Sequence, residues 1–330
     1  MAVEIKTSGV KPLRNTFDHL VARFGDKPAN RYQEFSFDTQ PATNFHYKPL
    51  WNPDSEVYDI NASAIKMNDW YALKDPRQFY YGSYVSARAK QQEAIDQQLA
   101  FIDDIGSLSS LPEKAKNLLT EIIVALRHYE WGANTNNNFI AAYGYGTTIT
   151  QAATIATCDR LAMAQHLSRI GLLIDEKTGE SLDKAKRIWI ESPAWQGIRK
   201  DIEGVFVLRD WFEVFVAQNL VADGLMYPLI FDEFVSSFSR NYGNDLNSLT
   251  NYSVKWQSDF ARWVDSVVKT ASSESDENKE QINKWIDKWH ASIYSSLGDL
   301  AKLAFGIECD ESLEKINSSF IARISKLGLR

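Results

Sequence analysis

The sequence predicts an all-α protein built from long helices, and three observations support this class. From about residue 82 onward, apolar side chains recur at the three- and four-residue spacing of helix faces. Two segments, 147–174 and 195–226, are apolar on most of their faces, so each must be enclosed by other helices. No alternation of apolar and polar residues is long enough to indicate a strand. With 44% hydrophobic residues, the chain of 330 residues can bury a large core.

The first 81 residues predict an extended, irregular arm, separate from a bundle over 82–330. They contain many prolines and aromatic side chains but no sustained periodicity. Disordered tails are poor in aromatic residues, so we expect the arm to be ordered against a surface. That surface is either this chain's own bundle or, as we favour, at least partly another subunit, because aromatic residues are enriched at interfaces. The residues that we expect in such a contact are Phe45, Tyr47, Trp51, Trp70 and Tyr71.

The bundle is expected to begin with three helices. The first ends before a glycine and a proline, which stop the helical pattern and allow it to restart. The second covers 112–142, and "YGYGTT" (143–148) ends it. The two glycines of that segment form only a G-x-G, which is too little for a phosphate-binding loop. We expect Thr147 or Thr148 to cap the third helix, which runs to about residue 174.

The later helices are separated by short polar or proline-containing segments. The run "SSESDENKEQ" divides the last two of them, and the final one keeps Ile, Trp and Leu side chains on a single face. The expected helices cover 180–191, a segment that begins at Pro193, 195–226, 244–272 and 277–305.

Composition and charge exclude several classes of protein. The net charge is -7 and the 36 basic residues are spread along the chain, so we expect no nucleic-acid partner. The two cysteines stand in unrelated contexts, which fits a reducing cytoplasm rather than a disulfide framework. The first 15 residues lack the apolar region of a signal peptide. The most apolar window is interrupted by charged residues, so it indicates a buried core helix and no membrane span.

The segment "QSDFARWVDS" (257–266) has the frame of an iron-binding helix without its ligands. A pair of iron ions in a four-helix bundle takes Glu-x-x-His from each of two helices and one Glu from each of two others. Here Phe260 and Trp263 stand at the Glu and His positions. Only His290 has a carboxylate, Asp287, three residues before it, and we interpret these two as a structural surface pair. The sequence contains no G-x-S-x-G, H-E-x-x-H or P-loop motif.

Four segments of the sequence carry a resemblance to a known family. They are "RYQEFSFDTQPATNFHYKPLW" (31–51), "NDWYALKDPRQFYYGSYV" (68–85), "GTTITQAATIATCDRLAMAQHLSRI" (146–170) and "SPAWQGIRKDIEGVFVLRDWFEVFVAQNLV" (192–221). These segments are similar to the β subunit of the hydroxylase component of bacterial multicomponent monooxygenases, and most closely to that of multicomponent phenol hydroxylases. The resemblance implies a ferritin-like, ribonucleotide-reductase-like bundle of long helices.

The resemblance also implies that this chain has lost its iron ligands. The iron-binding subunit of the family has a run like D-E-L-R-H-x-Q on its second ligand helix, where this chain reads "DRLAMAQ" (159–165). The last ligand helix carries aromatic residues at both corresponding places, whereas "RHYEWGAN" and "NLVADGL" each keep a carboxylate. By resemblance, the chain has no metal ligands and no catalytic or cofactor-binding residues. The vestigial ligand positions are Glu130, Arg160, Met163, Asp223, Phe260 and Trp263.

We expect Arg160 to replace the lost cations. Two buried carboxylates without a counter-charge would be strongly destabilising. A guanidinium offers one positive charge and five donors, so we expect Arg160 to lie within salt-bridge distance of Glu130 or Asp223. The alternative is that Arg160 extends to the edge of the bundle while the carboxylates bond to hydroxyls or amides.

The function implied by the resemblance is that of a structural, non-catalytic subunit. The complex would be a dimer of αβγ units, with a di-iron centre in the α subunit and FAD and 2Fe–2S in a separate reductase, and a regulatory protein would act on it. It would hydroxylate phenol with O2 and electrons from NADH in the cytoplasm. Two alternatives stay open at this point. The chain could be a stand-alone di-iron oxygenase with divergent ligands, or a helical binding module unrelated to oxygenases.

Overall fold

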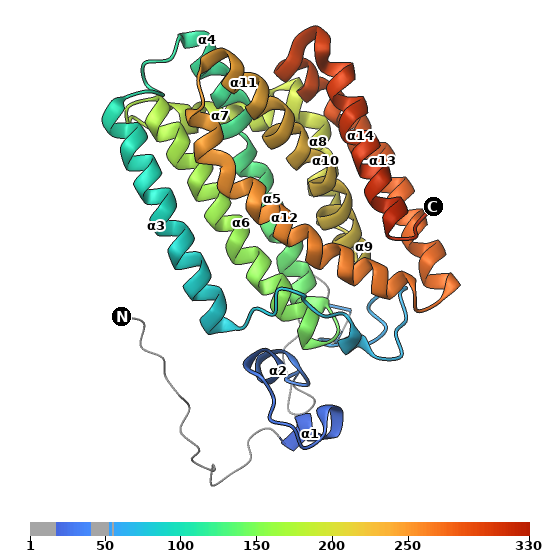
Figure 1. Cartoon of the computed structure of the whole chain (residues 1–330). Coiled ribbons are helices and arrows are strands. Elements are labelled where there is room, and N and C mark those ends of the chain that lie inside the picture. Colours follow the sequence, from blue (N-terminus) through green and yellow to red (C-terminus); the bar gives the residue numbers. More distant parts are fainter. Residues whose placement is uncertain (1–17, 41–52, 55) are drawn as a thin grey trace, which may run out of the picture.

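The computed structural model describes residues 18–40, 53–54 and 56–330 of the chain. Every regular element in these ranges is a helix, and long helices run side by side in a bundle (Figure 1). The predicted all-α, ferritin-like class is therefore confirmed. Three of the residues expected at an interface, Phe45, Tyr47 and Trp51, lie outside the described residues.

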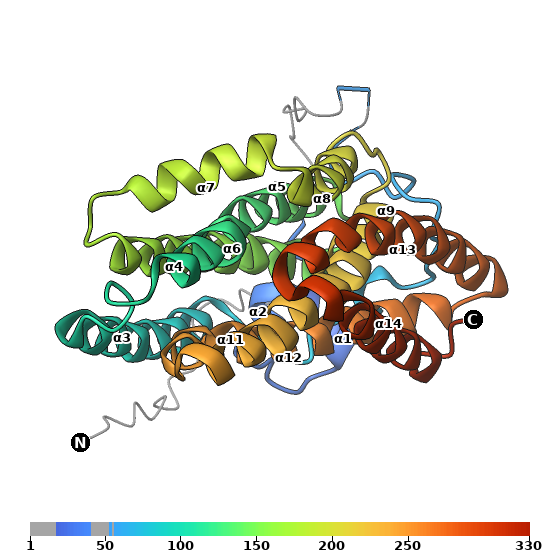
Figure 2. The same ribbon diagram turned by 90° about the horizontal axis from the view of Figure 1, so that it is seen from above.

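Four long helices enclose the centre of the bundle. They are α5 (Leu126–Tyr143), α6 (Thr147–Ile174), a continuous helix over Trp211–Tyr242, and α12 (Asp245–Ser272). A turn of three residues joins α5 to α6, which therefore run antiparallel and in close contact. Viewed from above, α7 lies on one side of α5 and α6 and α12 lies on the other (Figure 2). The interior between these helices holds the functional candidates.

The remaining helices surround this centre. α3 packs against α6 and α12, while α13 packs against α8, α14 and the helix Trp211–Tyr242. α4 continues through a π-helical turn (Thr120–Val124) into α5, as the predicted helix over 112–142 implies. The bounds are α3 Tyr81–Ile105, α4 Glu113–Leu119, α7 Glu180–Glu191, α8 Pro193–Val205, α13 Asp276–Phe305 and α14 Cys309–Lys326.

Two expectations about helix boundaries are wrong. The segment 195–226 is not one helix, because α8 ends at Val205 and a new helix begins at Trp211. The side chain of Asp210 starts this new helix by accepting the backbone N–H of Phe212 at 2.8 Å. The apolar pattern continues through the turn because both helices are buried, so periodicity alone did not reveal the break. The cap of α6 is Gly146, whereas Thr147 donates its hydroxyl to the carbonyl of Ser36 at 2.7 Å.

The helix Trp211–Tyr242 contains two π-helical turns. Its parts are α9 (Trp211–Phe215), a π turn over Val216–Ala222, α10 (Asp223–Tyr227), a π turn over Pro228–Phe234, and α11 (Val235–Tyr242). π-Helical turns are uncommon in proteins, but those that do occur often lie at functional sites. The helix is long and apolar enough to cross a membrane, yet 94% of its most apolar window is buried inside the chain, so it serves as a core helix.

The described part of the arm packs on this chain's own bundle. It contains α1 (Asp18–Phe24), α2 (Arg31–Ser36) and a 3₁₀ turn (Trp70–Ala72). Trp70 is only 4% exposed, and its ring lies 5.6 Å from that of Trp211. Tyr71 stacks on Phe37 of the same arm at 5.7 Å. Trp70 and Tyr71 thus contact other residues of their own chain. This agrees with the alternative that the arm packs on its own bundle.

A second contact anchors the arm directly over α12. Arg77 and Asp75 form a buried ion pair at 2.9 Å, and the backbone N–H of Asp75 donates to the hydroxyl of Tyr32. The guanidinium of Arg77 lies 5.4 Å from the ring centre of Trp263 and 5.8 Å from that of Phe260. The arm therefore covers the part of α12 that carries the two aromatic replacements.

Burial of one histidine generates a testable pH dependence. His166 on α6 has its Nε2 2.9 Å from the amide oxygen of Gln92 on α3. Burial, and to a smaller extent the charge of Arg169, lowers the pKa of His166 to about 4 from its ordinary value of 6.5. Between these two values the unfolded chain binds more protons than the folded one, so the free energy of unfolding rises with pH across this window.

We expect His166→Gln to reduce this slope. Gln keeps a hydrogen-bonding group toward Gln92 but does not titrate. The free energy of unfolding of the wild type, relative to the variant, should increase by up to about 1.4 kcal/mol per pH unit within the window. Urea unfolding of both proteins at several pH values from 4 to 7.5 measures this difference in the free energy of unfolding. Equal slopes for the two proteins would contradict the assignment of a neutral, buried imidazole.

Candidate functional site: a buried charge cluster

The centre of the bundle contains a cluster of charged and polar side chains without access to solvent. We call it the Arg160 cluster. The three charged residues are each 0% exposed, and they come from α5, α6 and α10. Charged side chains are almost never fully buried unless they are paired. The members of the cluster are Tyr129, Glu130, Arg160, Gln218, Asp223 and Tyr227.

Arg160 binds both carboxylates. Its Nη1 donates to Oε2 of Glu130 at 3.0 Å and to the hydroxyl of Tyr227 at 3.1 Å. Its Nη2 pairs with Oδ2 of Asp223. The predicted salt bridge is therefore confirmed, and it includes both candidate partners. The alternative, in which Arg160 extends to the edge of the bundle, is wrong.

Neutral donors occupy the remaining carboxylate oxygens. The hydroxyl of Tyr227 donates to Oε1 of Glu130 at 2.6 Å, and that of Tyr129 donates to Oδ1 of Asp223 at 2.7 Å. Gln218 donates its amide to the same oxygen of Asp223 at 3.1 Å. Each carboxylate thus accepts from one charged donor and at least one neutral donor. This satisfies most of the hydrogen-bonding capacity of a buried ion.

Aromatic rings close the cluster on the side of α12. The Cζ of Arg160 lies 4.7 Å from the ring centre of Trp256 and 5.2 Å from that of Phe260, a cation–π arrangement. These two rings stack on each other at 4.6 Å. Trp263 packs against Phe260 at 5.4 Å between ring centres. The α12 helix therefore presents aromatic faces to the guanidinium where a ligand helix would present oxygen and nitrogen.

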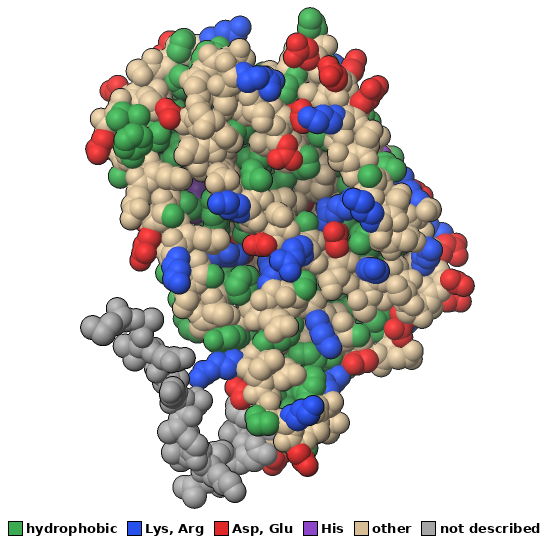
Figure 3. Space-filling view, in the orientation of Figure 1, with side chains coloured by type: hydrophobic (Ala, Val, Ile, Leu, Met, Phe, Trp, Pro, Cys, Tyr) green, Lys and Arg blue, Asp and Glu red, His purple; other side chains and the backbone are tan. Residues whose placement is uncertain are grey.

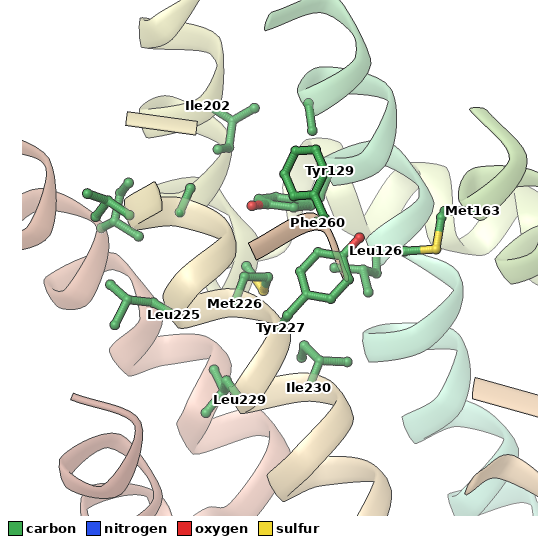
Figure 4. Close-up of a cluster of buried hydrophobic side chains, with 14 of the residues drawn as sticks. Leu126, Tyr129, Met163, Ile202, Leu225, Met226, Tyr227, Leu229, Ile230 and Phe260 are labelled. Carbon is green, nitrogen blue, oxygen red and sulfur yellow. The ribbon is translucent and has the colours of Figure 1, made fainter. Parts of the chain in front are cut away.

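Met163 is buried in the same region but away from the charged groups. It is 1% exposed, and its sulfur accepts a weak hydrogen bond from Ser253 at 3.5 Å. Figure 4 shows Met163 near Leu126, with Tyr129, Tyr227 and Phe260 in the same cluster of buried side chains. Of the six vestigial positions, Glu130, Arg160, Asp223 and Phe260 meet directly, whereas Met163 and Trp263 fill the adjoining volume.

A second ion pair, between the buried Asp159 and the partly buried Arg88, adjoins the cluster. Asp159 accepts from Nε and Nη2 of Arg88, both at 2.7 Å, and from the hydroxyl of Tyr84 at 3.0 Å. It also accepts the indole N–H of Trp256 at 2.8 Å. Trp256 thus bonds to one buried carboxylate and stacks over Arg160. Trp256 was not among the residues predicted from the sequence, although it stands one helical turn before Phe260 and on the same face of α12.

Tyr129 and Tyr227 were also missed. Tyr129 directly precedes Glu130, and Tyr227 follows Asp223 by four residues, which is one helical turn. Their spacing does place them beside the carboxylates. However, a tyrosine in an apolar helix resembles any other core residue until its hydroxyl is seen to bond.

Burial dominates the electrostatics of the cluster. It raises the pKa of Glu130 and that of Asp223, while the charge of Arg160 opposes both shifts. For Arg160, burial alone would lower the pKa, but the two carboxylates and two tyrosines raise it well above its ordinary value. Burial also raises the pKa of Tyr129 and Tyr227. The guanidinium is therefore permanently charged, and the tyrosines stay protonated as donors.

These residues do not fit a pair of iron ions. Iron in such a bundle takes carboxylate oxygens and imidazole nitrogens. Here both carboxylates are already bound to Arg160, which has no lone pair to offer, and Phe260 has no donor atom. In residues 18–40, 53–54 and 56–330, no group of three or more His, Cys, Asp or Glu side chains could hold a metal ion. The donor set suits a buried salt bridge.

The expected pair of Asp287 and His290 is wrong. Nε2 of His290 lies 2.7 Å from the amide oxygen of Asn317, and its ring stacks on Phe320, both on α14. Asp287 pairs instead with Arg330 near the C-terminus. The two side chains lie on the same turn of α13 but contact different partners, because α14 packs along this helix.

Comparison with known proteins identifies the family. Residues 48–275 match the model of the Methane/Phenol/Alkene Hydroxylase family, and the chain belongs to this family. It is 47% identical to the oxygenase component DmpL of phenol 2-monooxygenase from Pseudomonas sp. (strain CF600), over 100% of this chain and 99% of the relative. It is 26% identical to the hydroxylase component subunit beta of the toluene-4-monooxygenase system of Ectopseudomonas mendocina, over 84% and 86% of the two chains.

A solved structure supports the same assignment. The crystal structure of phenol hydroxylase from Pseudomonas sp. OX1 contains a chain that is 41% identical to this one, with a TM-score of 0.92 over 99% of both chains. The resemblance to subunits of multicomponent phenol hydroxylases is therefore confirmed over the whole length of the chain.

The cluster predicts a specific pattern of stability. Arg160→Met should lower the free energy of unfolding by about 3–5 kcal/mol, because it leaves two buried carboxylates without a counter-charge. The triple variant Arg160→Met, Glu130→Gln, Asp223→Asn should recover at least half of that loss, because the amides still accept from Tyr129 and Tyr227 but carry no charge. Chemical denaturation of the wild type, the single variant and the triple variant measures these free energies of unfolding.

Arg169→Met is the matched control for this series. Arg169 also lies on α6 and pairs with a carboxylate, Asp96, but both side chains are partly exposed. Its loss should therefore change the free energy of unfolding by no more than about 1 kcal/mol. If the single and triple variants at the cluster were equally unstable, the charge would not be what stabilises it.

Proposed function

We propose that this chain is the structural, non-catalytic subunit of a phenol or aromatic hydroxylase complex. The complex inserts one atom of O2 into an aromatic ring and reduces the other to water with electrons derived from NADH. The single observation that carries this proposal is the double salt bridge of Arg160 with Glu130 and Asp223 at 0% exposure. In this chain a permanent organic cation occupies the position that a metal-binding relative needs for its ligands.

The role of the chain is to keep the partner subunit in a fixed conformation. Arg160 ties α5, α6 and α10 together at the centre of the bundle by binding a carboxylate on α5 and one on α10. A buried network in which nearly every polar group is paired favours one arrangement of helices over others. A rigid bundle of this kind can serve as a fixed surface for a neighbouring subunit. The iron chemistry then belongs to that neighbour, and this chain contributes no reacting group.

The names of the relatives support a complex of unlike subunits. They include an oxygenase component, a hydroxylase component subunit beta, and a hydroxylase component small subunit of propane 2-monooxygenase from Gordonia sp. (strain TY-5). We infer a dimer of αβγ units in the cytoplasm, with the di-iron centre in α. A regulatory protein and a reductase with FAD and 2Fe–2S act on it. Phe45, Tyr47 and Trp51 of the arm remain the predicted contacts with α.

Two other functions are less well supported. A stand-alone di-iron oxygenase would need ligands that the Arg160 cluster does not offer. A helical binding module unrelated to oxygenases would not match a hydroxylase chain over 99% of its length.

The test uses the assembled hydroxylase and the triple variant Arg160→Met, Glu130→Gln, Asp223→Asn in this chain. We expect the complex to keep its full iron content, measured by mass spectrometry of the metal, and its rate of phenol hydroxylation within about twofold of the wild type. Iron should stay with the larger subunit when the subunits are separated. A proportional loss of iron in the variant would show that these carboxylates are ligands and would overturn the proposal.

A further inference from the structure

A small pocket lies between α12 and the second π-helical turn of the core helix, Pro228–Phe234. Its volume is about 180 Å³. Elsewhere on the face of the molecule where α12 lies, Figure 3 shows scattered Lys, Arg, Asp and Glu side chains. A mainly apolar hollow is therefore a local feature, and we call it the Phe231 pocket. Its walls include Tyr227, Pro228, Phe231, Asp232, Val254 and Gln257.

The π-helical turn fixes the orientation of one polar group in the wall. Pro228 has no backbone N–H, so the carbonyl groups of the preceding turn lack one donor. Nε2 of Gln257, on α12, donates to one of these carbonyls, that of Asp223, at 3.4 Å. The amide nitrogen of Gln257 is thereby held at the helix, which leaves its oxygen as the open group.

That oxygen is an acceptor without a donor. Oε1 of Gln257 has no hydrogen-bond partner in the part of the chain that the structure describes, and water does not reach it. A buried acceptor without a donor is destabilising. Since Gln257 forms part of the wall, a ligand that brings one O–H group into the pocket can supply the donor after a small rotation of the amide.

Aromatic rings give the pocket its apolar surface. The rings of Tyr227 and Phe231 lie 5.2 Å apart at an angle of 49°, and the two side chains are 2% and 3% exposed. A cavity of about 150 Å³ with apolar walls can bind benzene, whereas drug-sized ligands need about 300 Å³ or more. The volume of the Phe231 pocket therefore suits one substituted benzene ring, packed against the two rings.

The chemistry of the wall selects among small aromatic ligands. None of the described residues that line the pocket is Lys, Arg or His, so an anion finds no counter-charge there, and Asp232 repels it. Asp232 is exposed, so water and salt screen its attraction for a cation. A hydrocarbon such as toluene would leave Oε1 of Gln257 without a donor. The class that fits is a neutral aromatic ring with one hydroxyl group.

We propose that the Phe231 pocket binds phenol or a small substituted phenol. The ring lies against Tyr227 and Phe231, and the hydroxyl donates to Oε1 of Gln257. This inference rests on the proposed function, because phenols are the substrate class of the proposed complex.

Binding in this pocket is linked to the Arg160 cluster through one side chain. The ring of Tyr227 lines the pocket, while its hydroxyl donates to Glu130 inside the bundle at 2.6 Å. A ligand that binds the folded chain and not the unfolded one stabilises the fold. Phenol therefore stabilises the packing of α10 against α12 whenever the substrate of the complex is present.

Hydrogen exchange in the assembled hydroxylase tests the proposal. A ligand of this size binds with a Kd of about 1 mM. Where exchange requires the pocket to open, ~10 mM phenol should then slow it by about tenfold in segments 227–234 and 254–258, with half of the effect near 1 mM. Peptide mass spectrometry reads both segments in the intact complex.

Val254→Trp fills the pocket and should remove this protection. Val254 is 36% exposed at the rim, so the larger side chain should not disturb the fold. Val85→Trp is the matched control, because Val85 also lies on a long helix, α3, and is 43% exposed. Protection by phenol should persist in the control. Equal protection of the wild type and Val254→Trp would overturn the pocket as the binding site.

Gln257→Leu tests the hydrogen bond to the ligand. The variant should bind phenol at least about tenfold more weakly, because the acceptor is lost. Fluorobenzene, which has no hydroxyl, should protect the wild type and the variant equally, and this also shows that the pocket is still formed. If fluorobenzene bound the wild type as tightly as phenol does, Gln257 would have no role in recognition and the proposed ligand class would be wrong.

Charged ring compounds provide the test of the other occupants. Tighter binding of protonated benzylamine or of benzoate than of phenol would overturn the assignment of a neutral phenol. The absence of any protection by phenol would overturn the pocket but leave the proposed function intact, since that function is judged by iron content and hydroxylation rate. Crystals of the hydroxylase soaked with 4-bromophenol should show the anomalous signal of bromine beside Phe231.

Discussion

The structure depends on one guanidinium placed between two carboxylates where water cannot reach. Glu130 and Asp223 would be untenable in a dry interior without a positive charge nearby. Arg160 supplies that charge and, with its planar fork, binds both of them at once. Tyr129, Tyr227 and Gln218 satisfy further oxygens, so the cluster is close to complete as a hydrogen-bonded unit.

The same interaction organises elements that are distant in the sequence. Trp256 of α12 covers the guanidinium and bonds to Asp159, which in turn holds Arg88 of α3. On the other side, Arg77 of the arm lies over Phe260 and Trp263. Five helices and the arm therefore meet around one buried charge.

Sequence alone determined the class of the fold and most helix boundaries, because these follow from apolar periodicity. The vestigial ligand positions stay a prediction from the family resemblance. The sequence also predicted that Arg160 would neutralise a carboxylate, since a buried charge must be paired. Tertiary structure decided that Arg160 binds both partners and that Trp256, Tyr129 and Tyr227 complete the cluster. It also broke the segment 195–226 in two and separated Asp287 from His290. These outcomes depend on which helix packs against which, and hydroxyls, indoles and turns inside an apolar pattern leave no periodic signal from which that packing could be read.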